Sequence, residues 1–150
     1  MNGVIDEQAI IDQANRDGIT HISTGVAVVR EGKILMVRRV AADFLGGNYE
    51  LPGGGVDEGE TITEGAIREF KEETGLTVSK IITTFAGFDY STDRKPHVRQ
   101  INFIVEVTPE EVMLEPKEHD DFIWIDAHNL KEIKMSANMR KCIENAFISN

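Results

Sequence analysis

The chain has 150 residues, a formal net charge of −10 and a single cysteine. This length is common for one domain and allows about two-thirds of the unfolded surface to be buried. The negative charge argues against binding to a nucleic-acid backbone. A single cysteine excludes an intramolecular disulfide and fits a reducing cytoplasm. No apolar run reaches the ~18 residues of a membrane helix, so we expect a cytoplasmic domain without membrane contacts.

The first third of the chain is expected to hold a helix, a hairpin and a short strand. Helical spacing of isoleucines and alanine precedes Gly18, and two apolar runs flank the turn pair Glu31-Gly32. The elements expected from these patterns cover residues 6–16, 21–30, 33–39 and 49–51, with a loop at 40–48.

A capped helix is predicted between Thr61 and Gly75. Thr61 and Glu64 have the spacing of a capping box, T-x-x-E. Gly75 suits the left-handed position just past a helix end. On the helical wheel one arc is apolar and is made by Ile62, Ala66, Ile67, Phe70 and Thr74.

The second half of the chain continues the alternation of strands and helices. Alternating apolar residues such as Ile101, Phe103 and Val105 are typical of a half-buried strand. We expect strands at 77–88, 98–107 and 122–125, a polar loop at 89–97, and helices at 126–133 and 136–148. The order predicts an α/β fold in which a mixed sheet lies between helices.

Three carboxylates of the capped helix are expected to form one acidic arc beside the apolar one. Glu72 and Glu73 lie three and four positions after Glu69, and like charges at this spacing cost a few tenths of a kcal/mol per pair. Divalent cations would remove that repulsion, because Mg²⁺ and Mn²⁺ prefer oxygen ligands. The adjacent Arg68 can orient the carboxylates. A solvated acidic face is the alternative interpretation.

The segment from Gly54 to Leu76, GGVDEGETITEGAIREFKEETGL, resembles the signature box of the Nudix (MutT-like) hydrolases, G-x5-E-x7-R-E-U-x-E-E-x-G-U, with U a bulky apolar residue. Every fixed position is filled, by Gly54, Glu60, Arg68, Glu69, Phe70, Glu72, Glu73, Gly75 and Leu76. The resemblance implies an α/β/α sandwich with a mixed sheet. It divides the chain into an N-terminal helical extension, 1–20, and a Nudix hydrolase domain, 21–150.

The family's chemistry implies hydrolysis of a nucleoside diphosphate linked to another moiety. The resemblance makes Glu69, Glu72 and Glu73 ligands of Mg²⁺ or Mn²⁺, joined by the backbone carbonyl of Gly53. Arg68 would fix those carboxylates, and Glu60 would support the loop before the helix. Divalent ions neutralise phosphate charge and generate hydroxide near neutral pH. Arg68 and Glu72 are therefore expected among the catalytic residues.

One more acid outside the box is expected to act as a base or added ligand. In MutT-type members it lies six positions before a tryptophan, which here places it at Glu118, six before Trp124. Its rivals in the same loop are Glu115, Asp120 and Asp121. His119 could act as a general base near neutral pH, but a histidine in a polar loop is more often solvated or capping. The other histidines, His21, His97 and His128, have no supporting constellation.

Substrate choice depends on residues outside the box. Arg39, at the end of the second expected strand, and Asn138, near a base-binding asparagine of MutT-type enzymes, are the predicted substrate contacts. The marker arrays of NADH-type and ADP-ribose members are missing, which favours a nucleoside triphosphate, including an oxidised one, as substrate. ADP-ribose and dinucleoside polyphosphates remain alternatives, as does a nucleotide-sensing domain without catalysis.

Two further expectations concern the ends of the chain. Residues 1–20 either serve a homodimer interface, as in some family members, or cover one edge of the sheet. Cys142 lies in an amphipathic segment and is expected to be a packed core thiol rather than a nucleophile.

Overall fold

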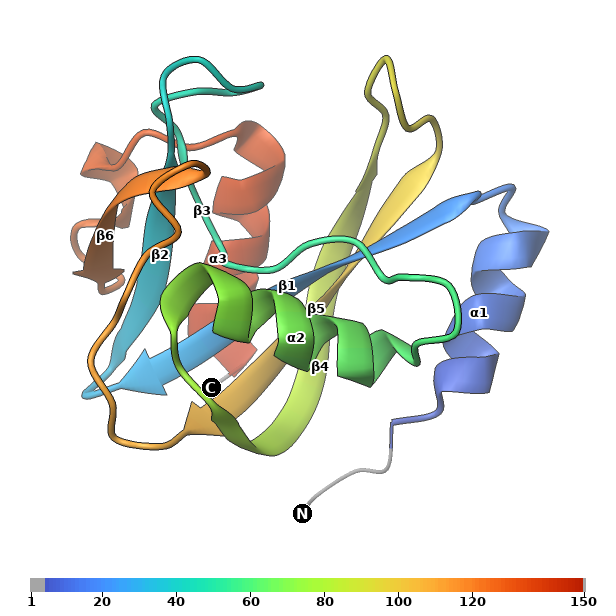
Figure 1. The fold of residues 1–150 in the computed structure, drawn as a ribbon, viewed down its shortest axis with the longest axis horizontal. Coiled ribbons are helices and arrows are strands. Elements are labelled where there is room, and N and C mark those ends of the chain that lie inside the picture. The colour runs from blue at the N-terminus through green and yellow to red at the C-terminus, as the bar shows by residue number, and fades with distance from the viewer. Residues whose placement is uncertain (1–4, 150) are drawn as a thin grey trace.

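The computed structural model describes residues 5–149 and contains a six-stranded sheet between helices (Figure 1). The order of elements follows the expected alternation. The elements are α1 Glu7–Arg16, β1 His21–Arg30, β2 Lys33–Arg39, β3 Tyr49–Glu50, α2 Ile62–Thr74, β4 Val78–Tyr90, β5 Val98–Val107, β6 His119–Ile125, the 3₁₀ turn Leu130–Glu132 and α3 Ala137–Ser149.

The sheet is mixed, which confirms the predicted fold class. Its strand order is β3-β2-β1-β5-β4, and β6 pairs with β2 outside this path. β1 and β5 run parallel, with His21 opposite Val98 and Val28 opposite Val105. The other pairs are antiparallel. The parallel pair β1–β5 therefore has an antiparallel neighbour on each side, β2 next to β1 and β4 next to β5.

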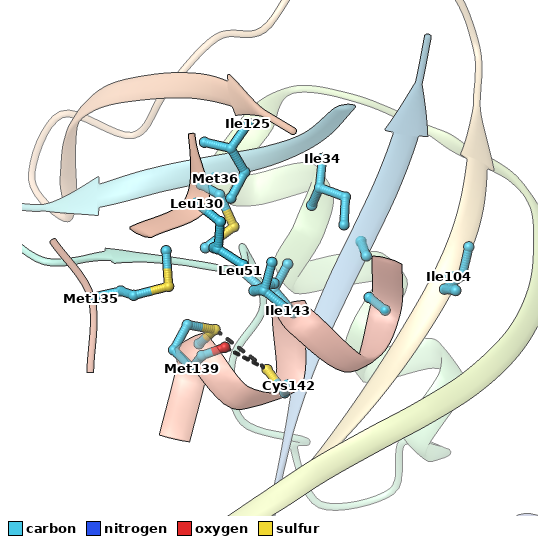
Figure 2. Close-up of a cluster of buried hydrophobic side chains, with 12 residues drawn as sticks. Ile34, Met36, Leu51, Ile104, Ile125, Leu130, Met135, Met139, Cys142 and Ile143 are labelled. Carbon is cyan, nitrogen blue, oxygen red and sulfur yellow. Dashed lines mark hydrogen bonds between the residues drawn. The ribbon is translucent and has the colours of Figure 1, made fainter. Parts of the chain in front are cut away.

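Helices α2 and α3 cover opposite faces of the sheet (Figure 1). Successive side chains of a strand point to opposite faces: Val26 and Val28 pack with the core under α2, and Ala27 with the core under α3. Figure 2 shows the core under α3, in which Met139 and Cys142 of α3 face the sheet. Cys142 is buried as expected, and burial raises the pKa of its thiol to about 11.

The predicted caps of α2 are confirmed. Thr61 Oγ1 accepts a hydrogen bond from the Glu64 N–H, and Glu64 Oε1 accepts one from the Thr61 N–H, each at 3.0 Å. Gly75 has a φ of 75°, which is the left-handed region that favours glycine. Both helix ends therefore follow from local sequence.

The structure corrects two expectations in the C-terminal third. The helix predicted at 126–133 is only a 3₁₀ turn, because Asp126 Oδ1 accepts the N–H groups of His128 and Asn129 and holds the chain in a turn. The strand predicted at 122–125 begins earlier, at His119. Residues 119–121 are predicted to lie in a polar loop, but His119 and Asp121 pair with the end of β2, and the register shifts at Asp120 between them.

Helix α1 is tied to the rest of the molecule at both ends. Glu7 Oε1 accepts the N–H of Thr63 in the first turn of α2, at 3.0 Å. At the other end Asp17 pairs with Arg99 of β5, at 2.9 Å, and Ile10 packs against the core under α2. Within residues 5–149, no helix has the length and apolar character required to cross a membrane.

Candidate active site

The loop from Leu51 to Gly55, between β3 and α2, lies against β1. The N–H groups of Thr24 and Val26 donate to the carbonyls of Gly54 and Pro52, both at 2.8 Å. A Cβ atom on Gly53 would lie 2.1 Å from the Thr24 carbonyl oxygen, and the φ of Gly53 is 154°. Only glycine allows the loop this close to the strand.

Arg68 links the loop before α2 to two glutamates in the second half of that helix. Its Nε and Nη2 donate to Glu60, at 2.8 and 2.9 Å, and Nη2 also donates to the Gly55 carbonyl at 3.1 Å. Its Nη1 lies 3.1 Å from Glu69 and 3.3 Å from Glu72. One guanidinium fork thus fixes two of the predicted metal ligands and the loop before them.

Glu60 stabilises the loop that precedes α2. Its Oε1 accepts the Asp57 N–H at 2.7 Å, and the hydrogen bonds from Arg68 lower its pKa. Glu69 differs, because burial raises its pKa despite the contact with Arg68. The two carboxylates therefore have different electrostatic surroundings although one arginine contacts both.

Glu73 is buried, with 3% of its surface exposed. Its Oε1 accepts the Gly53 N–H at 3.1 Å, whereas its Oε2 has no hydrogen-bond partner within the described residues. Burial raises the pKa of Glu73 to about 9, and the charge of Glu50 adds to that rise. Glu73 is thus buried with one carboxylate oxygen unpartnered within the described residues, whereas the Glu72 side chain is exposed.

His119 lies beside Glu73 and is 2% exposed, so the expectation of a solvated histidine is wrong. Its Nε2 is 2.8 Å from Glu50 Oε2, and its Nδ1 is 3.5 Å from Glu73 Oε2. The cause is the early start of β6, which pairs His119 with Arg39 of β2. The register shifts between Arg38 and Arg39, so that Asp120 is skipped, and period-two alternation counted back from Ile125 could not have predicted the place of the side chain at 119.

The expected additional acid, Glu118, is brought to the same place. The ligand atoms of Glu73, Glu118 and His119 all lie within 4.8 Å of one another. Two rivals are engaged elsewhere: Asp120 pairs with Arg38, and Asp121 accepts from the Tyr49 hydroxyl. The third, Glu115, accepts the N–H of Lys117 in its own turn.

These residues fit a divalent cation. Glu73 Oε2 is a buried carboxylate oxygen without a hydrogen bond within residues 5–149, and such an oxygen is costly unless a cation or donor satisfies it. Glu118 and Glu69 add negative charge nearby, and both raise the Glu73 pKa. Carboxylate oxygens are the ligands that hard divalent cations prefer.

A cavity of about 870 Å³ lies between the 40–48 loop, the β4–β5 turn and the start of α3. Both predicted substrate contacts, Arg39 and Asn138, line it. The Arg39 nitrogens are bonded to Glu50, Asp43 and the Phe44 carbonyl, which leaves the guanidinium held by the chain itself. Glu50 lines the cavity and also contacts His119, so it joins the cavity to the acidic cluster.

Aromatic and polar side chains make up much of the cavity wall. Phe44 is exposed on the 40–48 loop, and Tyr90 lies at the end of β4. The lining residues are Arg39, Asp43, Phe44, Leu45, Asn48, Tyr49, Glu50, Phe88, Tyr90, Ser91, Thr92, Asp93, Arg94, Gln100, Ser136, Asn138 and Met139. A planar ligand with polar edges fits such a wall.

Curated relatives match parts of the chain. One, named ADP-ribose pyrophosphatase, from Methanocaldococcus jannaschii, is 42% identical over 82 residues, which are 53% of this chain and 47% of that protein. Another, named 8-oxo-dGTP diphosphatase, from Proteus vulgaris, is 32% identical over 60 residues, which are 40% of this chain and 54% of that protein. The matched regions thus span about half the length of these relatives.

A solved structure and a family model extend the likeness over most of the chain. The crystal structure of a MutT NUDIX hydrolase from Burkholderia pseudomallei superimposes with a TM-score of 0.71 and 25% identity, covering 83% of this chain and 96% of that one. The model of the NUDIX domain matches residues 19–146, which include the whole signature box, the acidic cluster and the cavity. By this match the chain belongs to the Nudix family of hydrolases.

Proposed function

We propose that the chain is a divalent-metal-dependent pyrophosphohydrolase acting on a nucleoside diphosphate linked to another group. The observation that carries the proposal is the buried Glu73, whose free Oε2 lies beside Glu118 and His119. An uncompensated buried carboxylate is destabilising, and functional sites are where such groups are retained. Its position within an intact signature box supports catalysis over nucleotide sensing alone.

Each carboxylate has a proposed role. Glu69, Glu72 and Glu73 would hold Mg²⁺ or Mn²⁺, together with the carbonyl of Gly53. When bound, the cation supplies neutralisation of the phosphate oxygens and acidification of a water molecule. Arg68 keeps Glu69 and Glu72 in place through its two contacts with them.

The proposed reaction breaks one bridging P–O bond. The oxygen of a water molecule attacks phosphorus, and the bridging oxygen leaves with the other phosphate group. Glu118 is exposed and lies within reach of the buried cluster, so one of its carboxylate oxygens would accept the proton of the attacking water while the other stays available to the cation. Arg39 and Asn138 hold the nucleotide at the cavity wall, Asn138 through an amide that both donates and accepts.

The substrate we propose is a nucleoside triphosphate, including an oxidised purine one, cleaved to the monophosphate and pyrophosphate. The cavity lies next to Glu50, which contacts the cluster, and its wall offers Phe44 and Tyr90 for stacking against a base. The relative named 8-oxo-dGTP diphosphatase supports this class. ADP-ribose is the second candidate, because the M. jannaschii relative at 42% identity is named for it.

A nucleotide panel tests the proposal. Canonical and 8-oxo nucleoside triphosphates, ADP-ribose and dinucleoside polyphosphates are incubated with the protein in Mg²⁺ and in Mn²⁺, and products are separated by chromatography. Metal-dependent release of a monophosphate from one class supports the enzyme and selects its substrate. Nucleotide binding without any cleavage would overturn the enzyme in favour of a sensor domain.

A further inference from the structure

The side chain of His119 points an unused nitrogen into the acidic cluster. Its Nδ1 has no hydrogen-bond partner within the described residues, although only 2% of the surface of His119 is exposed. The nearest acceptor, Glu73 Oε2, is 3.5 Å away, which is beyond an ordinary N–H···O hydrogen bond. Two buried polar atoms, His119 Nδ1 and Glu73 Oε2, therefore lie next to each other, and neither makes a hydrogen bond within the described residues.

The other imidazole nitrogen fixes the ring. His119 Nε2 lies 2.8 Å from Glu50 Oε2, and Glu50 in turn accepts from Arg39 Nη1 at 3.2 Å. A proton on Nε2 satisfies Glu50 and leaves the Nδ1 lone pair directed at the cluster. Metal-binding histidines almost always donate their second ring N–H to a carboxylate, a backbone carbonyl or water, which sets the tautomer and the ring orientation, and Glu50 is such a carboxylate.

The spacing of the atoms suits a shared cation. Two donors bound to one ion at roughly 2.0–2.2 Å each cannot be more than about 4.4 Å apart, and Nδ1 and Oε2 are 3.5 Å apart. Glu118 is exposed, and one of its carboxylate oxygens lies within 4.8 Å of a ligand atom of each of these two residues, so a side-chain rotation brings it to a shared ion. Glu73 Oε1 is held by the Gly53 N–H, which leaves Oε2 for the ion.

We propose that His119 Nδ1 is a metal ligand alongside Glu73 and Glu118, and that the centre therefore binds a first-row transition cation such as Mn²⁺ or Co²⁺ in preference to Mg²⁺. Mg²⁺ selects oxygen and binds an imidazole nitrogen poorly, whereas first-row transition ions accept one, with an affinity that is lowest for Mn²⁺ and rises towards Co²⁺. The proposal rests on the metal centre of the proposed function and adds one nitrogen to its oxygen ligands.

The direct test is magnetic resonance of Mn²⁺ bound to the metal-stripped, full-length protein. Electron spin echo measurements detect a nitrogen bonded to Mn²⁺ through its modulation of the echo. We expect imidazole modulation in the wild type, its loss in His119→Gln, and its persistence in His128→Gln, a matched change at an exposed histidine. Bound Mn²⁺ without nitrogen modulation in the wild type would overturn the proposal, and this measurement needs no variant to fold.

Calorimetric titration with Mg²⁺, Mn²⁺ and Co²⁺ gives a second readout. In His119→Gln the affinity for Mn²⁺ and Co²⁺ should fall by about tenfold or more, while the affinity for Mg²⁺ changes much less. An equal loss for all three ions would mean that His119 only positions Glu73, and would overturn the proposed ligation.

Turnover of the nucleotide panel separates this inference from the proposed function. Mg²⁺-supported hydrolysis without nitrogen modulation in Mn²⁺ would leave the hydrolase in place and remove only the His119 ligand. Nitrogen modulation without hydrolysis of any nucleotide would keep the His119 ligand and remove the proposed activity.

Discussion

Glu72 and Glu73 are neighbours in the sequence but lie in opposite environments. The Glu72 side chain is 57% exposed and contacts Arg68, whereas Glu73 is buried and contacts the Gly53 N–H. Successive helical residues are ~100° apart, so one carboxylate faces solvent and the other faces the sheet. Substitutions of the two residues should therefore affect different properties of the protein.

Glu72→Gln is expected to abolish most turnover without changing the fold. Several kcal/mol of charge stabilisation by a metal ion correspond to a loss of roughly 100-fold or more in kcat. The free energy of unfolding should change by less than about 0.5 kcal/mol, because Glu72 is exposed. Turnover in Mg²⁺ and urea unfolding measure the two effects. Glu58→Gln, at an exposed acid of the preceding loop, is the control, and equal rates in both variants would refute the role of Glu72.

Among the elements, α2 depends on its capping box. Thr61→Ala removes the acceptor of the Glu64 N–H and should lower the free energy of unfolding by about 1 kcal/mol. Thr63→Ala is the matched control, since the Thr63 hydroxyl makes no hydrogen bond within the part of the chain described. Chemical denaturation of both variants is the measurement. Equal stability losses would show that the cap is not what the Thr61 hydroxyl contributes.

Helix α1 packs on the domain through one side. We propose that the described part of the N-terminal extension, residues 5–20, is docked on the domain that follows it, with Ile10 among its apolar contacts. Ile10→Ser should lower the free energy of unfolding by about 1–2 kcal/mol, because its half-buried surface is transferred from water on docking. Ile11→Ser, at a neighbour that is 38% exposed, should change stability by less than about 0.5 kcal/mol. Thermal unfolding compares them, and no difference between the two would contradict the docking.

At the scale of the whole molecule, stability without metal should depend on pH through Glu73. Its pKa is raised from 4.5 to about 9, first by burial. Between these values the folded state keeps a proton that the unfolded state has lost, so rising pH destabilises the fold. The slope from this one group approaches about 1.4 kcal/mol per pH unit. Below pH 4.5 both states are protonated and the contribution is complete.

Unfolding of chelator-treated protein from pH 5 to 9 measures this slope. Glu73→Gln should remove it, because the amide does not titrate, and an undiminished slope in that variant would show that another group is responsible. Mg²⁺ or Mn²⁺ should stabilise the wild type more at pH 8 than at pH 5.5, since the cation requires the ionised carboxylate.

Local patterns in the sequence were enough for most of the framework. β1, β2 and β5 have the predicted bounds, and both caps of α2 are confirmed. Alternation, turn pairs and capping residues act over only a few positions, so their signals are complete within a short segment. The signature box from Gly54 to Leu76 likewise identified the family, because its fixed residues surround a single helix.

The surroundings of the carboxylates were decided by the tertiary structure. Glu50, Glu73 and His119 are far apart in sequence, and they meet only because β6 pairs with β2 while α2 packs on the sheet. The same pairing buried His119 and placed Glu50 between it and Arg39. Charge, burial and ligand geometry at this centre depend on contacts between distant segments, whereas the identity of the box residues did not. The sequence by itself determined which acidic residues are present and which family they indicate. Only the tertiary structure determined that Glu73 is the buried one and that it lies beside His119.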